Sequence, residues 1–150
     1  MAVAEERTGR DTLRALAASL CALLVGLAGP AAAADTAGER AGAAARTWLA
    51  AADTESGAET WALAAPMFQD RIDSEEWLKK LTAVRGPLGA VVKRTLISAT
   101  HACSLPGAPD GDYEVVKFQT EFEHKASAVE TVITVRQPDG SWRVAGYFIN

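Results

Sequence analysis

The chain has 150 residues, 15 of them basic and 19 acidic, which gives a formal net charge of −4. Because charges of both signs are interspersed along the sequence, we expect neither a nucleic-acid partner nor an anionic membrane surface as a target.

The first 34 residues predict a secretory signal peptide. The segment contains arginines, then an uncharged apolar run from Ala15 to Ala28, then Gly29-Pro30 and the small residues of Ala32-x-Ala34. We expect cleavage after Ala34, a periplasmic or secreted location, and no stable membrane insertion afterwards. An uncleaved N-terminal membrane anchor is the alternative, because the uncharged run approaches the ~20 residues that span a bilayer.

Cleavage would remove Cys21 and leave Cys103 as the only cysteine of the mature chain. An intramolecular disulfide would then be impossible, so stability would come from burial alone. Residues 35–40 are mostly small and polar, and we expect them to be a flexible lead-in. Residues 41–150 are predicted to form a single α+β domain, which is a usual length for one core.

Helical spacing begins with Ala41 and continues to Ala52, so a first helix is predicted there. Ser56 is a candidate N-cap for a short second helix that carries Trp61. Pro66 should end this helix, because proline disfavours helical geometry in the residue before it.

A third helix is predicted after Asp73. Asp73 and Glu76 have the spacing of a capping box, and Gly86-Pro87 should close the helix. We therefore expect three helices before the first strand.

From Ala90 onwards the hydrophobic period changes from 3.6 to about 2, which is typical of strands. Turn-forming residues separate the strands, among them the segment Gln137-Pro138-Asp139-Gly140. The pattern favours an antiparallel meander. The predicted strands are Val91–Ala102, Tyr113–Phe122, Ser127–Arg136 and Ser141–Ile149.

Alternation assigns the two faces of the second predicted strand. Phe118 and Phe122 should face the helices, whereas Gln119 should face solvent. With a polar turn over residues 123–126, Phe122 would oppose Ser127 and Gln119 would oppose Glu130. Three acids are then expected on the outward face: Glu121, Glu123 and Glu130.

The same reasoning leaves Glu114 as the one acid that leans inward, near the mouth of the expected cone. In the last strand the even positions carry the larger apolar side chains. Trp142 and Phe148 are therefore predicted to be buried against the helices.

Four segments occur in an order that resembles the bacterial family labelled domain of unknown function 4019. They are Val84-Arg85-Gly86-Pro87-Leu88-Gly89, residues 105–113, Glu130-Thr131-Val132 and residues 139–147. The resemblance runs from about Trp48 to Ile149 and implies an exported bacterial protein without an established activity. Three helices packed on a curved four-stranded meander would be similar to the cone of cystatin-like and nuclear-transport-factor-2-like proteins.

No catalytic constellation is identified. His101 and Cys103 stand two apart and share a strand face, so a thiolate–imidazole pair is conceivable. No Asn or Asp that could orient the imidazole is identifiable, and we expect both residues to be inert. His124 lies in a predicted turn and no spacing matches a zinc site, so neither metal nor cofactor is expected.

Three residues are candidates for a binding cavity: Trp61, Arg94 and Thr120. A buried arginine must be paired or face a ligand anion, and the structural alternative for Arg94 is a pair with an acid from a helix. Thr120 is a polar residue between Phe118 and Phe122. Trp61 could floor a pocket, although core packing explains it equally well.

The loop over residues 104–112 has two prolines and a negative tip, Asp110-Gly111-Asp112. It could face a protein partner or be a rigid hairpin connection. Taken together, the sequence predicts a non-catalytic binding or interaction module of the bacterial envelope that recognises a small molecule or another envelope protein. The alternative is a small isomerase or hydrolase that uses a carboxylate in the cone.

Overall fold

The computed structural model describes residues 36–54 and 57–150. The expected signal peptide, residues 1–34, and the candidate N-cap Ser56 lie outside these residues. The described part belongs to one compact unit, Ala34–Asn150. Within residues 36–54 and 57–150, no helix is long and apolar enough to cross a bilayer.

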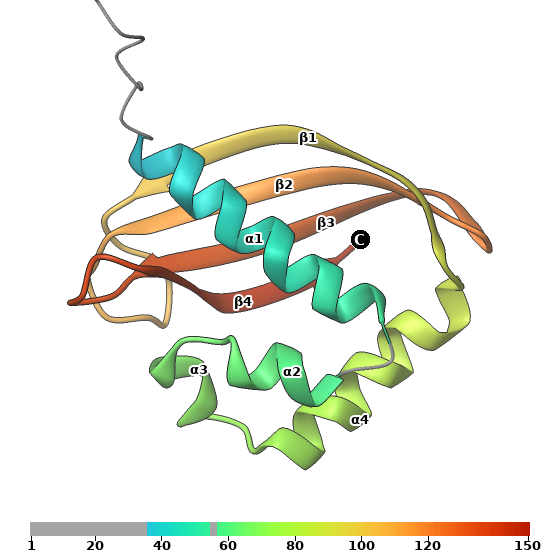
Figure 1. Cartoon of the computed structure of the whole chain (residues 1–150), viewed down its shortest axis with the longest axis horizontal. Coiled ribbons are helices and arrows are strands. Elements are labelled where there is room, and N and C mark those ends of the chain that lie inside the picture. Colours follow the sequence, from blue (N-terminus) through green and yellow to red (C-terminus); the bar gives the residue numbers. More distant parts are fainter. Residues whose placement is uncertain (1–35, 55–56) are drawn as a thin grey trace, which may run out of the picture. The chain divides into compact units, whose positions relative to one another are not determined.

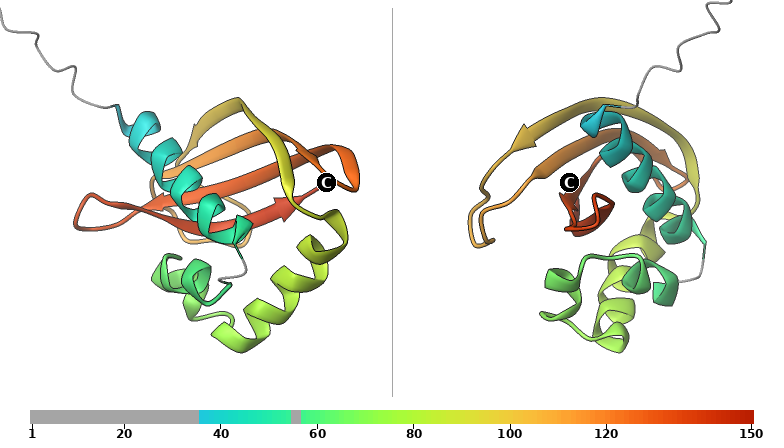
Figure 2. Two further views of the ribbon diagram at one scale, coloured as in Figure 1. Left: turned by 45° about the vertical axis from the view of Figure 1, so that its right-hand side comes forward. Right: turned by 60° about the vertical axis from the view of Figure 1, so that its left-hand side comes forward.

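The fold is α+β, with helices packed on a curved four-stranded antiparallel meander, as predicted. The strands are hydrogen-bonded in chain order, β1-β2-β3-β4, and α1 lies across the concave face of the sheet (Figures 1 and 2). The elements are α1 (Ala37–Asp53), α2 (Gly57–Ala62), α3 (Pro66–Gln69), α4 (Ser74–Arg85), the 3-10 turn η1 (Gly86–Leu88), β1 (Val91–Ala102), β2 (Tyr113–Phe122), β3 (Lys125–Arg136) and β4 (Trp142–Ile149).

A capping box starts α1 earlier than expected. The Glu39 backbone N–H donates to the Thr36 hydroxyl at 3.2 Å, and the Thr36 backbone N–H donates to the Glu39 carboxylate at 2.6 Å. Two amides that a helix start leaves without partners are thereby satisfied. Ala37–Arg40, predicted to belong to a flexible lead-in, are therefore the first turn of α1.

The second predicted helix is shorter than expected, because its last residues join the sheet edge. The Ala65 backbone N–H donates to the Val144 carbonyl at 2.7 Å, and Ala64 forms a parallel bridge with Val144. Pro66 does not end a helix but begins α3, since the first helical position needs no amide donor. The described part thus has four α-helices where three were predicted.

The pairing of β2 with β3 differs from the prediction by one residue. Only Glu123 and His124 form the turn. Two residues of β3, Ala126 and Ser127, lie opposite the single residue Glu121 of β2, which is a β-bulge in β3. Phe118 therefore opposes Glu130. A one-residue change of register moves every side chain to the other face of the sheet.

The prediction that Glu130 faces solvent is consequently wrong, because the side chain is fully buried. Glu121 and Glu123 are exposed, as predicted.

A second bulge decides which side chains of β4 face the helices. Trp142 is only 8% exposed, as predicted, but Phe148 is 56% exposed, and its predicted burial is wrong. Ala145 is an extra residue in β4, inserted between the partners of Ile133 and Thr134. Beyond it the inward positions change from even to odd, so that Tyr147 packs against the core instead.

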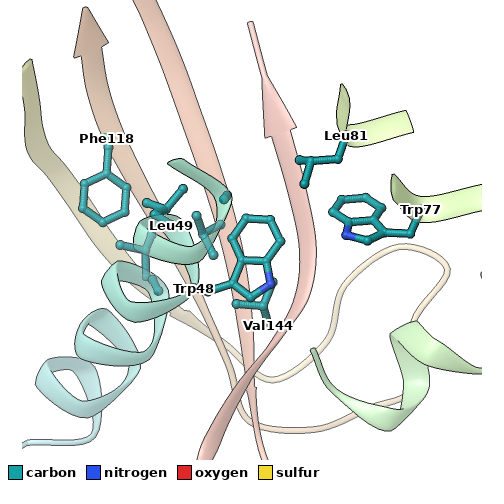
Figure 3. Close-up of a cluster of buried hydrophobic side chains, with 10 residues drawn as sticks. Trp48, Leu49, Trp77, Leu81, Phe118 and Val144 are labelled. Carbon is teal, nitrogen blue, oxygen red and sulfur yellow. The ribbon is translucent and has the colours of Figure 1, made fainter. Parts of the chain in front are cut away.

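The space between helices and sheet is filled by large apolar side chains (Figure 3). The indole N–H groups of Trp48 and Trp77 donate to the backbone carbonyl and the hydroxyl of Thr60, respectively, each at 2.8 Å. Their ring centroids lie 6.1 Å apart. These contacts join α1, α2 and α4 into one layer. The labelled members of the cluster are Trp48, Leu49, Trp77, Leu81, Phe118 and Val144.

Candidate functional site

A fully buried carboxylate, that of Glu130 in β3, lies at the centre of a polar cluster. Its Oε1 accepts hydrogen bonds from Arg85 Nη1 at 3.0 Å and from the Tyr147 hydroxyl at 2.6 Å. Its Oε2 accepts from Arg94 Nε at 2.6 Å and from the Thr120 hydroxyl at 2.5 Å. A carboxylate offers about four acceptor positions, so the lone pairs of Glu130 are all in use.

Asp53 supplies a second carboxylate on the solvent side of the same two arginines. Its carboxylate accepts a bidentate pair of hydrogen bonds from Arg94, from Nη1 at 2.7 Å and from Nη2 at 2.8 Å. It also accepts a hydrogen bond from Arg85 Nη2. Two acids and two guanidinium groups thus alternate in a closed ring without net charge. We call these four residues, with Thr120 and Tyr147, the Glu130 cluster.

Distant parts of the chain bring this cluster together. Asp53 is the last residue of α1 and Arg85 the last residue of α4, where the negative end of the helix dipole favours a cation. Arg94 in β1 opposes Thr120 in β2. The Arg85 guanidinium also lies 5.5 Å from the centroid of the Phe122 ring, a cation–π contact.

The protonation states of two members follow from their surroundings. Burial lowers the pKa of Arg94, but hydrogen bonds and charges from Asp53 and Glu130 outweigh this effect and raise the pKa above its ordinary value. Burial and the negative charge of Glu130 raise the pKa of Tyr147, and Arg85 opposes them only in part. The Tyr147 phenol is therefore protonated at neutral pH and donates to Glu130.

An open cleft of about 480 Å³ adjoins the cluster, between the C-terminal ends of α1 and α4 and the start of β1. Asp53 and Arg85 lie on its wall, and Leu78, Leu81 and Val91 supply apolar surface. The arrangement can offer a polar edge and an apolar wall to a small molecule. It offers no free carboxylate lone pair at Glu130 for proton transfer.

Two of the three predicted binding candidates meet in the cluster. Arg94 and Thr120 both donate to Glu130, and Arg94 also pairs with a helix acid, Asp53. Trp61 lies elsewhere, in α2, where it packs against the core and its indole N–H donates to the Ile72 carbonyl at 2.8 Å.

Four members of the cluster were not identified from the sequence: Asp53, Arg85, Glu130 and Tyr147. Both faces of β3 carry apolar residues, so only the register with β2 shows that Glu130 points inward. Asp53 and Arg85 are 32 residues apart and each ends a helix. A local pattern therefore contains no signal for their contact.

His101 and Cys103, predicted to lack an orienting group, have carboxylates beside them. Cys103 Sγ lies 3.6 Å from His101 Nε2. Glu114 Oε2 lies 3.8 Å from His101 Nδ1, and Asp112 Oδ1 lies 3.9 Å from Nε2. No orienting Asn or Asp is identifiable from the sequence; the structure places the carboxylates of Asp112 and Glu114 beside the imidazole, at distances longer than a hydrogen bond. Glu114 is buried on the inward face, where it was expected to lean.

The loop over residues 104–112 is held against the sheet. The Tyr113 hydroxyl donates to the Pro109 carbonyl at 2.7 Å, and Leu105 and Ala108 pack on a small cluster that includes Tyr113 and Val135. These contacts support a rigid connection. Within residues 36–54 and 57–150, no group of three or more His, Cys, Asp or Glu residues is arranged to hold a metal ion.

The fold is that of an α+β domain in which helices cover one face of the sheet, and the cluster is a ring of ion pairs that is buried at Glu130 and open to solvent at Asp53. The model of a family of proteins of unknown function, DUF4019, matches residues 44–147, so the chain belongs to this family. No curated protein is significantly similar to the chain. A crystal structure of a candidate ketosteroid isomerase from Shewanella frigidimarina is similar with a TM-score of 0.49 and 17% identity, over 77% of this chain and 96% of that chain.

Proposed function

We propose that the chain is a non-catalytic binding module that is exported to the bacterial envelope, where it recognises a small molecule or another envelope protein. The observation that carries the proposal is the saturation of Glu130. A carboxylate that acts as general base needs a free lone pair within reach of a substrate proton. Glu130 has four donors and no exposed surface.

The packing of the interior supports the same conclusion. An isomerase or hydrolase of the alternative kind would hold its substrate between helices and sheet. In this chain the ring centroids of Trp48 and Tyr147 lie 4.9 Å apart between helices and sheet. Phe68 packs edge-on against Trp77, with a centroid separation of 4.8 Å. Large side chains thus occupy the space that a substrate would need.

The cleft beside Asp53 and Arg85 is the proposed recognition surface. Its volume of about 480 Å³ is within the range of small-molecule sites. Leu78 is 39% exposed on its wall and would contact the apolar part of a ligand. The charged side chains of Asp53 and Arg85 on the same wall would select the polar part of the ligand.

Native mass spectrometry of the protein from the envelope fraction of its own host tests the proposal. We expect a chain that begins at Asp35, which reports cleavage after Ala34, together with a non-covalent adduct. Leu78→Glu should remove the adduct, because it places a charge on the cleft wall.

Leu63→Glu is the matched control, since Leu63 is similarly exposed, at 37%, but lies outside this cleft. It should retain the adduct. A wild-type chain that carries no adduct, or an adduct that persists in Leu78→Glu, would refute recognition at this cleft. A chain that retains Met1 in the membrane fraction would refute processing.

A further inference from the structure

A second group of chemically active side chains lies at the other end of β1 from Arg94. His101 opposes Glu114 in the register of β1 and β2, so both side chains are on the same face. Cys103 follows directly after β1 and is exposed to solvent. Its Sγ lies 3.6 Å from His101 Nε2, on the side of the imidazole away from Glu114.

Glu114 is the feature that marks this place as more than a surface thiol. The residue is only 6% exposed, and its side chain faces the imidazole of His101 across the pairing of β1 with β2. Its Oε2 is directed at His101 Nδ1, at 3.8 Å. A buried carboxylate is costly unless it is paired, and the imidazole becomes a partner of opposite charge only when it is protonated.

Two other charged groups, Asp112 and Arg136, lie on the Nε2 side of His101. Asp112 Oδ1 lies 3.9 Å from Nε2, although Asp112 is half exposed and also faces Arg136 Nη1 at 3.7 Å. Both carboxylates thus face ring nitrogens of His101. Cys103 is the group in contact with Nε2 that can supply the proton.

We propose that Cys103 is a reactive thiol that undergoes thiol–disulfide exchange with small disulfides, with His101 as its base and Glu114 as the positioning residue. His101 Nε2 takes the thiol proton, and the Cys103 thiolate attacks one sulfur of the disulfide R–S–S–R. The new bond is Cys103–S–S–R, and the R–S⁻ that leaves takes the proton back from the imidazolium. The disulfide is the oxidant, and one thiol is exchanged for another.

The rate of reaction with 2,2′-dithiodipyridine, followed from about pH 5 to pH 9, tests this proposal. All proteins are full-length and carry Cys21→Ser, so that a single thiol is present. The reference is the double variant Cys103→Ser/Ser104→Cys, which moves the thiol by one residue to another exposed position.

We expect Cys103 to react about tenfold faster than the reference thiol at pH 6, where an ordinary thiol is almost fully protonated. His101→Gln should lower the rate to that of the reference, and Glu114→Gln should lower it severalfold. Mass spectrometry should show one mixed disulfide per chain.

Equal rates for Cys103 and the reference thiol throughout the pH range would overturn the proposal, as would an unchanged rate in His101→Gln. If Glu114→Gln does not fold, the comparison of wild type with His101→Gln decides the role of the imidazole.

Discussion

Glu130 shows how a charge can be kept inside a protein. Removing a carboxylate from water costs several kcal/mol, and one ion pair often fails to offset that loss. Glu130 has two guanidinium groups and two hydroxyls around it, so each lone pair accepts a hydrogen bond. Loss of any one donor leaves part of a buried charge without a partner.

Tyr147→Phe tests this at a single donor. At pH 7 we expect a loss of about 1–3 kcal/mol in the free energy of unfolding, because Glu130 Oε1 retains only Arg85. The pKa of Tyr147 is raised in the folded state. Wild-type stability should therefore fall as pH rises above about 10, where the unfolded chain releases the phenol proton and the folded chain keeps it.

The variant lacks this phenol, so its stability should fall less over the same alkaline range. Urea unfolding at pH 8, 9, 10 and 11 provides the comparison. If the two stability curves run parallel above pH 10, the assigned environment of Tyr147 is incorrect.

At the scale of elements, bulges in the sheet decide which side chains reach the core. The bounds of β1 and β2 could be predicted from the alternation of apolar and polar residues, and the start of α4 from Asp73, whose side chain accepts from the Glu76 amide at 2.8 Å. The inward position of Glu130 could not be predicted from the alternation, because it depends on a two-residue turn combined with an extra residue in β3. Both faces of that strand are apolar enough to accept either register.

The bulge at Ala145 makes a prediction of its own within β4. Trp142 lies before it and is buried, whereas Phe148 lies after it and is mostly exposed. Trp142→Ala should lower the free energy of unfolding by about 3–5 kcal/mol, and Phe148→Ala by less than about 1 kcal/mol.

Chemical denaturation of the two variants measures the difference. Equal losses would mean that the inward face of β4 does not change at Ala145.

At the scale of the whole folded unit, the Glu130 cluster joins the C-terminal ends of α1 and α4 to all four strands of the sheet. Asp53 and Arg85 join the C-terminal ends of α1 and α4 to each other; Arg94 of β1 pairs with Asp53, and Arg85 pairs with Glu130 of β3, so each helix end is also tied to the sheet. Partners in these pairs are 32 to 45 residues apart along the chain. Local spacing therefore predicted α1, α4 and the four strands, whereas the cluster emerges only from their packing. The same packing forms the cleft proposed for recognition.

The central claim is that Glu130 stabilises the fold and does not perform chemistry. Glu130→Gln keeps the shape of the side chain but leaves two partly buried guanidinium groups, those of Arg85 and Arg94, with one carboxylate, that of Asp53. We expect a loss of about 3–5 kcal/mol in the free energy of unfolding. Glu121→Gln, at an exposed position of β2 in the same hairpin, should change it by no more than about 0.5 kcal/mol.

Guanidinium chloride unfolding of wild type and these two variants is the most direct test. A functional carboxylate is commonly held at the expense of stability, so that its replacement leaves the fold equally stable or more stable. The account predicts a large loss that is specific to Glu130→Gln. Unchanged or increased stability in that variant would contradict it and favour the isomerase or hydrolase alternative.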